Sequence, residues 1–242
     1  MPPLRPVSSV PVASSRLERL LRELGPQIRR GATPALLPPP RCPTGIAEID
    51  GLLQGGFPRG YLSEVAGGAS SGRTALALGL LAEATRTGEI AAVVDAADTF
   101  DAASAVAAGV ALECVLWVRA PHVRAALRSA ERLLEARGFP LILLDLVGCE
   151  ARRACNPTVW SRLARAAAGA QAALVLLAGL RMAGTSAELS LEMQPGRACF
   201  VGTPALLEAL EVQAELARAR SGLSGTAGRT ASVRLRVLGP AA

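Results

Sequence analysis

The sequence predicts an α/β fold in which a mostly parallel, twisted β-sheet is flanked by helices and extended by antiparallel strands at its C-terminal end. Three observations lead to this prediction. Strand and helix patterns alternate between residues 61 and 180. The strand segments are apolar along their whole length, which is typical of parallel strands that are covered on both faces. After about residue 186 the alternation stops, and strand patterns follow one another directly.

An N-terminal segment, residues 1–43, precedes this pattern and is rich in proline. Within it, residues of about 14–24 predict one amphipathic helix. Its apolar positions recur with helical spacing, at Leu17, Leu20, Leu21 and Leu24. This apolar face either packs on its own domain or binds a partner, and the sequence leaves both readings open. The core is then expected to span residues 44–242.

The elements of the core follow in order along the chain. Apolar runs predict five strands, at residues 61–67, 89–96, 114–120, 139–148 and 172–180. Helical patterns lie between them, at residues 74–88, 101–109, 121–137 and 157–168. In the C-terminal region, about residues 186–240, the pair Pro195-Gly196 predicts the tight turn of a hairpin. Two more strand patterns follow, at residues 209–220 and 231–238.

Composition excludes several kinds of chemistry. All 26 basic residues among the 242 are arginines, against 20 acidic residues, so the formal net charge is +6. Without lysine the chain has neither a Schiff-base residue nor the usual lysine of a phosphate-binding loop. One histidine, His122, and five cysteines without a CxxC pair predict no metal site. Since no uninterrupted apolar stretch reaches about 18 residues, we expect a cytoplasmic protein with no membrane contact.

The sharpest motif is GGASSGRT at residues 67–74, between a predicted strand and a predicted helix. This is the context of a phosphate-binding loop, because Gly67 and Gly72 let backbone N–H groups approach an anion at the start of the helix. Arg73 stands where such loops carry lysine. Its planar guanidinium keeps the positive charge but does not reach the same point beside the phosphates. Asp95 and Asp145 end neighbouring strands, where they either line a ligand cleft or cap the turns that follow.

Four segments between residues 44 and 182 resemble, in the same order, those of RecA-type recombinases. They are TGIAEIDGLLQGGFPRGYLSEVAGGASSGRTALAL, VVDAADTFDAASAVAAGV, LILLDLV and LVLLAGLRM. The resemblance implies a RecA-like core with a nucleotide site at Gly67, Gly72, Arg73, Thr74 and Asp145. Thr74 and Asp145 match the positions at which the family binds Mg²⁺, so ATP and Mg²⁺ are the cofactors that it implies.

Four family positions have changed, however. The phosphate-binding lysine is Arg73, and the glutamate that activates the attacking water falls at Ala97. The adenine-stacking tyrosine falls at Ser104, and the glutamine that couples the nucleotide to the DNA loops falls at Gly179. Loss of a water-activating acid alone costs about 10²–10⁴-fold in rate, by analogy with general base catalysis. We therefore expect a degenerate site with little or no ATP turnover, and we assign no catalytic residue.

A C-terminal segment, LEVQAELARARSG at residues 210–222, resembles that of ImuA-type proteins. These are RecA-like accessory factors of bacterial mutagenic translesion synthesis. The resemblance implies a non-catalytic adaptor that is induced by DNA damage and modulates the RecA filament. Its implied partners are RecA, an inactive polymerase relative of the ImuB type and an error-prone replicative polymerase. Arg218 and Arg220 are candidate partner-binding residues on this segment.

Two other interpretations stay open at the level of the sequence. The first is a nucleotide-dependent ATPase or switch that binds single-stranded DNA directly. Its candidate DNA contacts are Arg152 and Arg153, in the loop after the strand that ends at Asp145, although an arginine pair in a loop is also ordinary solvated surface. The second is a cell-division inhibitor of the SulA type, a neighbouring relative within the same superfamily.

Overall fold

The computed structural model describes residues 39–149, 155–220 and 227–236. The predicted N-terminal helix, with its four leucines, lies outside the described residues, as does the pair Arg152 and Arg153. The helices are α2 (Ala47–Leu52), α3 (Arg73–Arg86), α4 (Ala102–Ala107), α5 (Val123–Ala136) and α7 (Pro157–Ala170), with 3-10 turns η2 (Leu112–Cys114) and η3 (Gly184–Ser186). The strands are β1 (Arg41–Cys42), β2 (Phe57–Pro58), β3 (Leu62–Gly67), β4 (Ala91–Asp95), β5 (Val115–Arg119), β6 (Leu141–Asp145), β7 (Ala173–Ala178), β8 (Leu189–Val201), β9 (Leu206–Ala219) and β10 (Thr230–Arg236).

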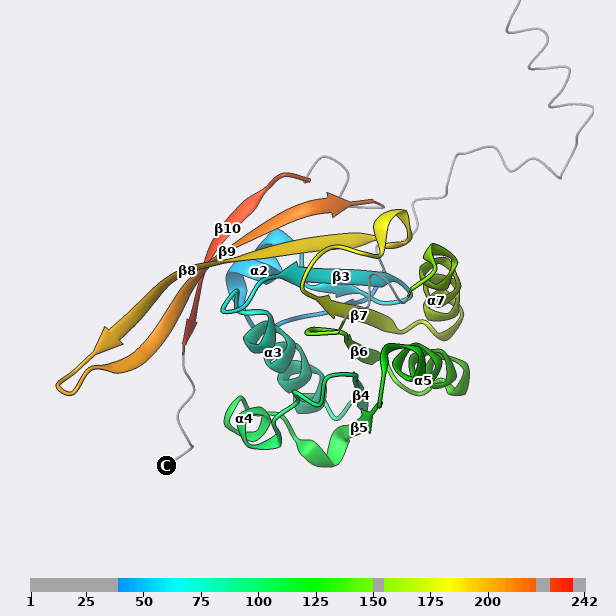
Figure 1. Cartoon of the computed structure of the whole chain (residues 1–242), viewed down its shortest axis with the longest axis horizontal. Coiled ribbons are helices and arrows are strands. Elements are labelled where there is room, and N and C mark those ends of the chain that lie inside the picture. Colours follow the sequence, from blue (N-terminus) through cyan, green and yellow to red (C-terminus); the bar gives the residue numbers. More distant parts are fainter. Residues whose placement is uncertain (1–38, 150–154, 221–226, 237–242) are drawn as a thin grey trace, which may run out of the picture. The chain divides into compact units, whose positions relative to one another are not determined.

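One eight-stranded sheet organises the core, in the order β10-β9-β8-β3-β7-β6-β4-β5 (Figure 1). The strands from β8 to β5 in this order pair in parallel, and β8, β9 and β10 pair antiparallel. The five predicted core strands and the antiparallel C-terminal region are therefore confirmed. Since parallel strands end at the same edge of a sheet, the loops after β3, β4, β6 and β7 lie together.

Apolar side chains form one hydrophobic cluster on each face of this sheet. The first packs α3 against strand residues such as Val65 and Leu143. The second packs α5 and α7 against the opposite face, where Trp160 and Leu163 of α7 are buried. Few aromatic residues contribute, so the core is built mainly from leucine, valine and alanine. Within the described residues, no helix is long and apolar enough to cross a bilayer.

The predicted turn at Pro195-Gly196 is wrong. β8 runs through both residues to Val201, and the turn lies at residues 202–205, before β9 begins at Leu206. Proline fits here because β3 pairs with β8 only as far as Met193, so that no N–H is needed on that side. Glycine fits because a Cβ atom at position 196 would lie 2.1 Å from the Glu211 carbonyl oxygen. The Pro195-Gly196 pair therefore forms a bulge inside a longer strand, not a turn.

A small substructure before β3 was not predicted from the sequence. β1 and β2 form a two-stranded antiparallel sheet, and α2 lies between them in the chain. The Asp50 carboxylate accepts hydrogen bonds from the backbone N–H and the hydroxyl of Thr44, at 2.8 and 2.9 Å. These bonds hold the segment before α2 close to α3, where a Cβ on Gly79 would lie 2.6 Å from the Thr44 carbonyl oxygen.

Candidate functional site

The phosphate-binding motif forms the connection from β3 to α3, as predicted. Gly72 immediately precedes the helix with φ 86°, a left-handed conformation that favours glycine. A Cβ on Gly67 would lie 2.4 Å from the Met193 carbonyl oxygen, and one on Gly72 would lie 2.3 Å from Leu235 Cδ1. The backbone of β8 thus leaves no room for a side chain at Gly67, and the left-handed conformation favours glycine at position 72, in addition to any role in binding an anion.

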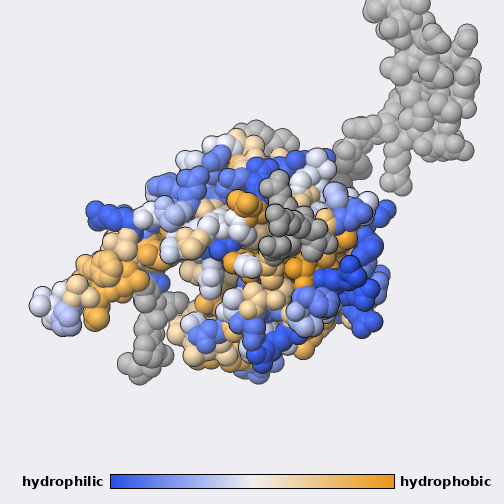
Figure 2. Space-filling view, in the orientation of Figure 1, coloured by the Kyte–Doolittle hydropathy of each residue, from blue (hydrophilic) through white to orange (hydrophobic). Residues whose placement is uncertain are grey.

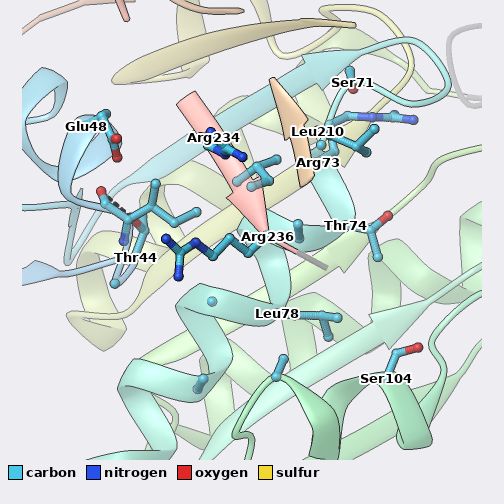
Figure 3. A pocket seen from close by; sticks show the side chains of 18 of the residues that line it. Thr44, Glu48, Ser71, Arg73, Thr74, Leu78, Ser104, Leu210, Arg234 and Arg236 are labelled. Atoms are coloured by element: carbon cyan, nitrogen blue, oxygen red, sulfur yellow. Dashed lines mark hydrogen bonds between the residues drawn. The ribbon is translucent and has the colours of Figure 1, made fainter. Parts of the chain in front are cut away.

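A cleft of about 850 Å³ opens beside this loop. Its size is that of a small-molecule site, which typically measures about 300–1,000 Å³. Figure 3 shows that residues from distant parts of the chain line it, including Thr44 before α2, Thr74 of α3 and Ser104 of α4, while the Arg73 guanidinium points away from Thr44. Arg234 and Arg236 of β10 line it as well. The C-terminal strand therefore contributes to the wall of the cleft.

The Arg73 side chain is hydrogen-bonded to the backbone of β7. Its Nη1 donates a hydrogen bond of 2.7 Å to the carbonyl oxygen of Ala178, at the carboxyl end of β7. Burial lowers the pKa of Arg73, and the negative charge of Asp145 opposes that shift. An arginine in this setting stays positively charged at neutral pH. The guanidinium thus links the start of α3 to the end of a neighbouring strand.

Asp95 and Asp145 lie opposite each other on β4 and β6. The buried Asp95 carboxylate accepts backbone N–H bonds from Ala97 and Phe100, at 3.1 and 2.9 Å. The Asp145 carboxylate accepts one from Val147 at 2.9 Å. Burial raises the pKa of Asp145 and nearby Asp95 adds to the rise, against the Val147 N–H bond and the charge of Arg73. Both acids therefore cap the turns that follow their strands, which is one of the two roles considered from the sequence.

Asp98 adjoins Ala97, the position of the missing glutamate, but is engaged elsewhere. It adopts φ 58°, and Arg119 donates two hydrogen bonds to its carboxylate, at 2.7 and 2.5 Å. These bonds lower the pKa of Asp98. The Arg119 guanidinium also lies 5.1 Å from the ring centre of Trp117, which packs on Phe100. Asp98 thus belongs to a surface cluster at the end of β5.

Glu64 is a site residue that sequence reasoning missed. It is fully buried in the middle of β3, and its Oε1 accepts N–H bonds from Met182 at 2.5 Å and Ala183 at 3.0 Å. The Ser190 hydroxyl lies 3.4 Å from Oε2. The carboxylate therefore holds the segment that follows β7. The signal was a single acid inside an otherwise apolar strand, because such a charge requires partners.

The two arginines predicted to bind a partner are integrated into the sheet edge. Arg220 Nη1 donates to the Thr185 carbonyl oxygen at 2.9 Å, and Arg218 lies opposite Ser190 in the β8–β9 pairing. At the opposite end of β9, Arg234 pairs with Glu208 at 2.9 Å. No group of three or more histidine, cysteine or acidic residues within the described ranges has an arrangement that suits a metal ion.

Comparison with known proteins now identifies the family. The description "RecA N-terminal domain" matches residues 40–189, more than half of the chain. Protein RecA of a Picosynechococcus species is 36% identical over 112 residues, which cover 46% of this chain and 32% of that protein. The chloroplastic DNA repair protein recA homolog 1 of Arabidopsis thaliana is 33% identical over 145 residues, 60% of this chain and 32% of that protein. These matches span about a third of each relative.

The solved structure of the RadB recombinase is similar in fold. It superposes with a TM-score of 0.62 at 20% sequence identity, and the match covers 80% of this chain and 95% of RadB. This agreement confirms the predicted fold class, with its mostly parallel sheet and antiparallel C-terminal strands. The collinear segments, the loop between β3 and α3 and these matches lead to one conclusion: the chain belongs to the RecA family.

Proposed function

We propose that this RecA-family chain is a non-catalytic accessory protein in DNA-damage-induced mutagenesis, which binds RecA and a translesion polymerase complex. The observation that carries the proposal is the anchoring of Arg73 on the Ala178 carbonyl oxygen. In a phosphate-binding loop the side-chain cation contacts the β and γ phosphates. Here the cation of the loop is engaged with the backbone of β7, which supports a binding role over ATP turnover.

The acids at the strand ends support the same interpretation. General base catalysis requires a carboxylate within hydrogen-bond reach of the attacking water. Ala97 supplies none, and the neighbouring Asp98 is held by Arg119. Asp95 accepts two backbone hydrogen bonds of its own turn. The described carboxylates of this edge are thus engaged in holding the fold.

The proposed mechanism is mimicry of a RecA protomer. A chain with the family core but without the residues that respond to nucleotide would join a filament end without propagating it. The polymerase complex would then bind through surfaces outside the shared core. The resemblance of residues 210–222 to ImuA-type proteins supports this assignment over a cell-division inhibitor of the SulA type.

The test is to mix the purified protein with RecA and single-stranded DNA. We expect inhibition of RecA ATPase activity and strand exchange that saturates near one chain per filament end, together with co-sedimentation on filaments. The control is the same titration with an unrelated basic protein, which binds DNA without a RecA-like surface. Unchanged RecA activity at excess protein, with no complex by pull-down, contradicts the proposal.

A second candidate, a nucleotide-dependent switch, is favoured by the cleft of about 850 Å³ beside the phosphate-binding loop, which Arg73 and Thr74 line but Asp95 and Asp145 do not. Titration with ATP and Mg²⁺ separates the two. ATP hydrolysis that Asp145→Ala abolishes and Asp98→Ala preserves would favour the switch. The adaptor proposal expects no hydrolysis above background in any of the three chains.

A further inference from the structure

The β8–β9 ribbon continues beyond the sheet that supports it. β8 pairs with β3 only from Leu189 to Met193, and β9 pairs with β10 only from Ala209 to Glu215. Residues 194–201 and 206–208 therefore have no further strand beside them among the described residues. We call residues 194–208 the arm, and Figure 1 shows it extending away from the helices and the rest of the sheet.

The tip of the arm is apolar on both faces. Phe200 is 60% exposed, Val201 50%, Leu206 67% and Leu207 39%. Phe200 pairs with Leu207 and Val201 with Leu206. Because directly opposite residues share a face and successive residues alternate, each face carries one apolar pair. Residues 198–207 contain no charged side chain, and Figure 2 shows hydrophobic surface along the arm. Exposed apolar surface of this kind marks an interaction site.

The free edge of the arm is protected against strand addition. Pro195 lacks an N–H group, and the β8–β9 register shifts between Pro195 and Ala198. Prolines and bulges on an unpaired edge prevent another strand from adding to it. Strand addition is therefore blocked at the base of the arm, and the exposed apolar side chains are the feature that the tip offers to a partner. Because apolar residues project from both faces, the complementary surface is a cleft that receives the tip as a wedge.

The charges at the base of the arm favour a protein cleft over a lipid surface. Arg197 lies 3.8 Å from Glu211, and Arg234 lies 2.9 Å from Glu208. These pairs form a polar rim around an apolar centre, as in protein–protein interfaces. Anionic membranes instead attract clusters of unpaired basic residues, and the arginines nearest the tip are paired with acids.

A second copy of the chain fits the tip less well. Two arms in face-to-face contact would cover one apolar pair of each and leave the other pair in water. The cleft beside the phosphate-binding loop is lined by Glu48, Glu83 and Arg236 among others. Burying those charged groups against an uncharged tip would cost free energy without any compensating hydrogen bond.

The family match indicates which protein partner the arm serves. This sequence match ends at residue 189, where β8 begins, so the sequence of the arm is not matched to the RecA N-terminal domain, although the fold match to RadB continues past residue 189. Contacts that imitate a RecA protomer would use the residues whose sequence matches RecA, 40–189. We propose that the tip, residues 198–207, inserts into an apolar, uncharged cleft on the polymerase side of the complex. This inference rests on the proposed function, in which both partners bind one chain.

The test uses the full-length chain, purified RecA filaments and the purified ImuB-type polymerase relative. Phe200→Ser and Leu206→Ser, combined, remove one apolar residue from each face of the tip. Ile90→Ser is the matched control, because Ile90 is 52% exposed and lies away from the arm, just before β4. Thermal unfolding of each variant checks that the fold is kept, since all three side chains are exposed.

We expect the double variant to bind the polymerase relative at least tenfold more weakly and RecA within twofold of the wild type. Ile90→Ser should bind both like the wild type. Binding of the polymerase relative within twofold by the double variant overturns the inference alone, and so does selective loss of RecA binding. A wild-type chain that binds neither partner overturns the proposed function, and the inference with it.

Two further measurements address the other occupants of the arm. Sedimentation of the chain alone would reveal a dimer, and a dimer that the double variant abolishes overturns the inference in favour of self-association. Co-sedimentation with phosphatidylserine vesicles that depends on the tip overturns it in favour of a membrane. We expect the wild type and the double variant to be monomers, and neither to bind the vesicles.

Discussion

Replacing Glu64 by alanine should destabilise the protein more than any other single change to an acidic residue of the phosphate-loop region. The carboxylate is fully buried and accepts hydrogen bonds from two backbone N–H groups, at 2.5 and 3.0 Å. Bonds to a charged acceptor contribute about 1.5–3 kcal/mol each, and a buried donor left without a partner costs a similar amount. With two donors orphaned, Glu64→Ala should cost about 3–5 kcal/mol of the free energy of unfolding.

Chemical and thermal denaturation, followed by circular dichroism, measure this cost. For a domain of this size, 1 kcal/mol shifts the midpoint by about 2–4 °C, so the expected drop is roughly 6–20 °C. Glu64→Gln keeps an acceptor oxygen and loses the charge, and should cost about 1–2 kcal/mol.

Glu192 provides the matched control, because its carboxylate pairs with Arg181, the residue just before the segment that Glu64 holds. Both side chains of this pair are partly exposed, and Arg181 Nη1 lies 3.1 Å from Glu192 Oε1. Exposed ion pairs of this kind contribute about 0–1 kcal/mol to stability. If the costs of Glu64→Ala and Glu192→Ala differ by less than about 1 kcal/mol, burial is not what makes Glu64 important for stability.

Three further predictions concern the loop and its surroundings. Gly72→Ala should cost about 2–4 kcal/mol, from a left-handed conformation and a contact of 2.3 Å with Leu235, whereas Gly68→Ala meets nothing within 4 Å and should cost under about 1 kcal/mol by urea denaturation. Asp145→Asn should stabilise the protein at neutral pH, because a raised folded-state pKa means that ionisation of this carboxyl opposes folding. Its advantage in midpoint should shrink as the pH falls, because the raised pKa of Asp145 lets the folded wild type take up the proton first, and an advantage that grows on acidification contradicts the sign. Arg73→Lys should produce no ATP hydrolysis in a phosphate-release assay, because the water-activating acid is still missing; turnover restored by this change alone would show that the other departures are unimportant.

The parts of the fold that local pattern determines could be predicted from the sequence. The apolar runs of β4, β6 and β7 and the loop from β3 to α3 were predicted within a few residues, because burial on both faces and glycine conformations leave local marks. The turn at Pro195-Gly196 was misplaced because the same residues suit a bulge on an unpaired edge. Whether these residues form a turn or a bulge depends on where β3 ends, at Gly67, which is more than 100 residues away in the chain.

The candidate site was less accessible to sequence reasoning. The position of Glu64 inside an apolar strand indicates that it has partners. Those partners, however, lie 118 and 119 residues further along the chain. The hydrogen bond from Arg73 to Ala178 likewise spans 105 residues. The substitution of lysine by arginine was visible, and its chemical difference could be argued. The acceptor to which the guanidinium turns depends on how the ends of two parallel strands meet, which spacing along the chain does not give.

The position of β3 also determines the order in which the chain can fold. This strand is formed early in the sequence, yet both of its neighbours, β7 and β8, come more than 100 residues later. During synthesis both edges of β3 therefore stay unpaired while β4, β5 and β6 pair with one another. Chains that stop before residue 189 lack one neighbour of β3, and an open apolar strand is prone to aggregate. Nascent or truncated forms should thus depend on chaperones far more than the finished protein does.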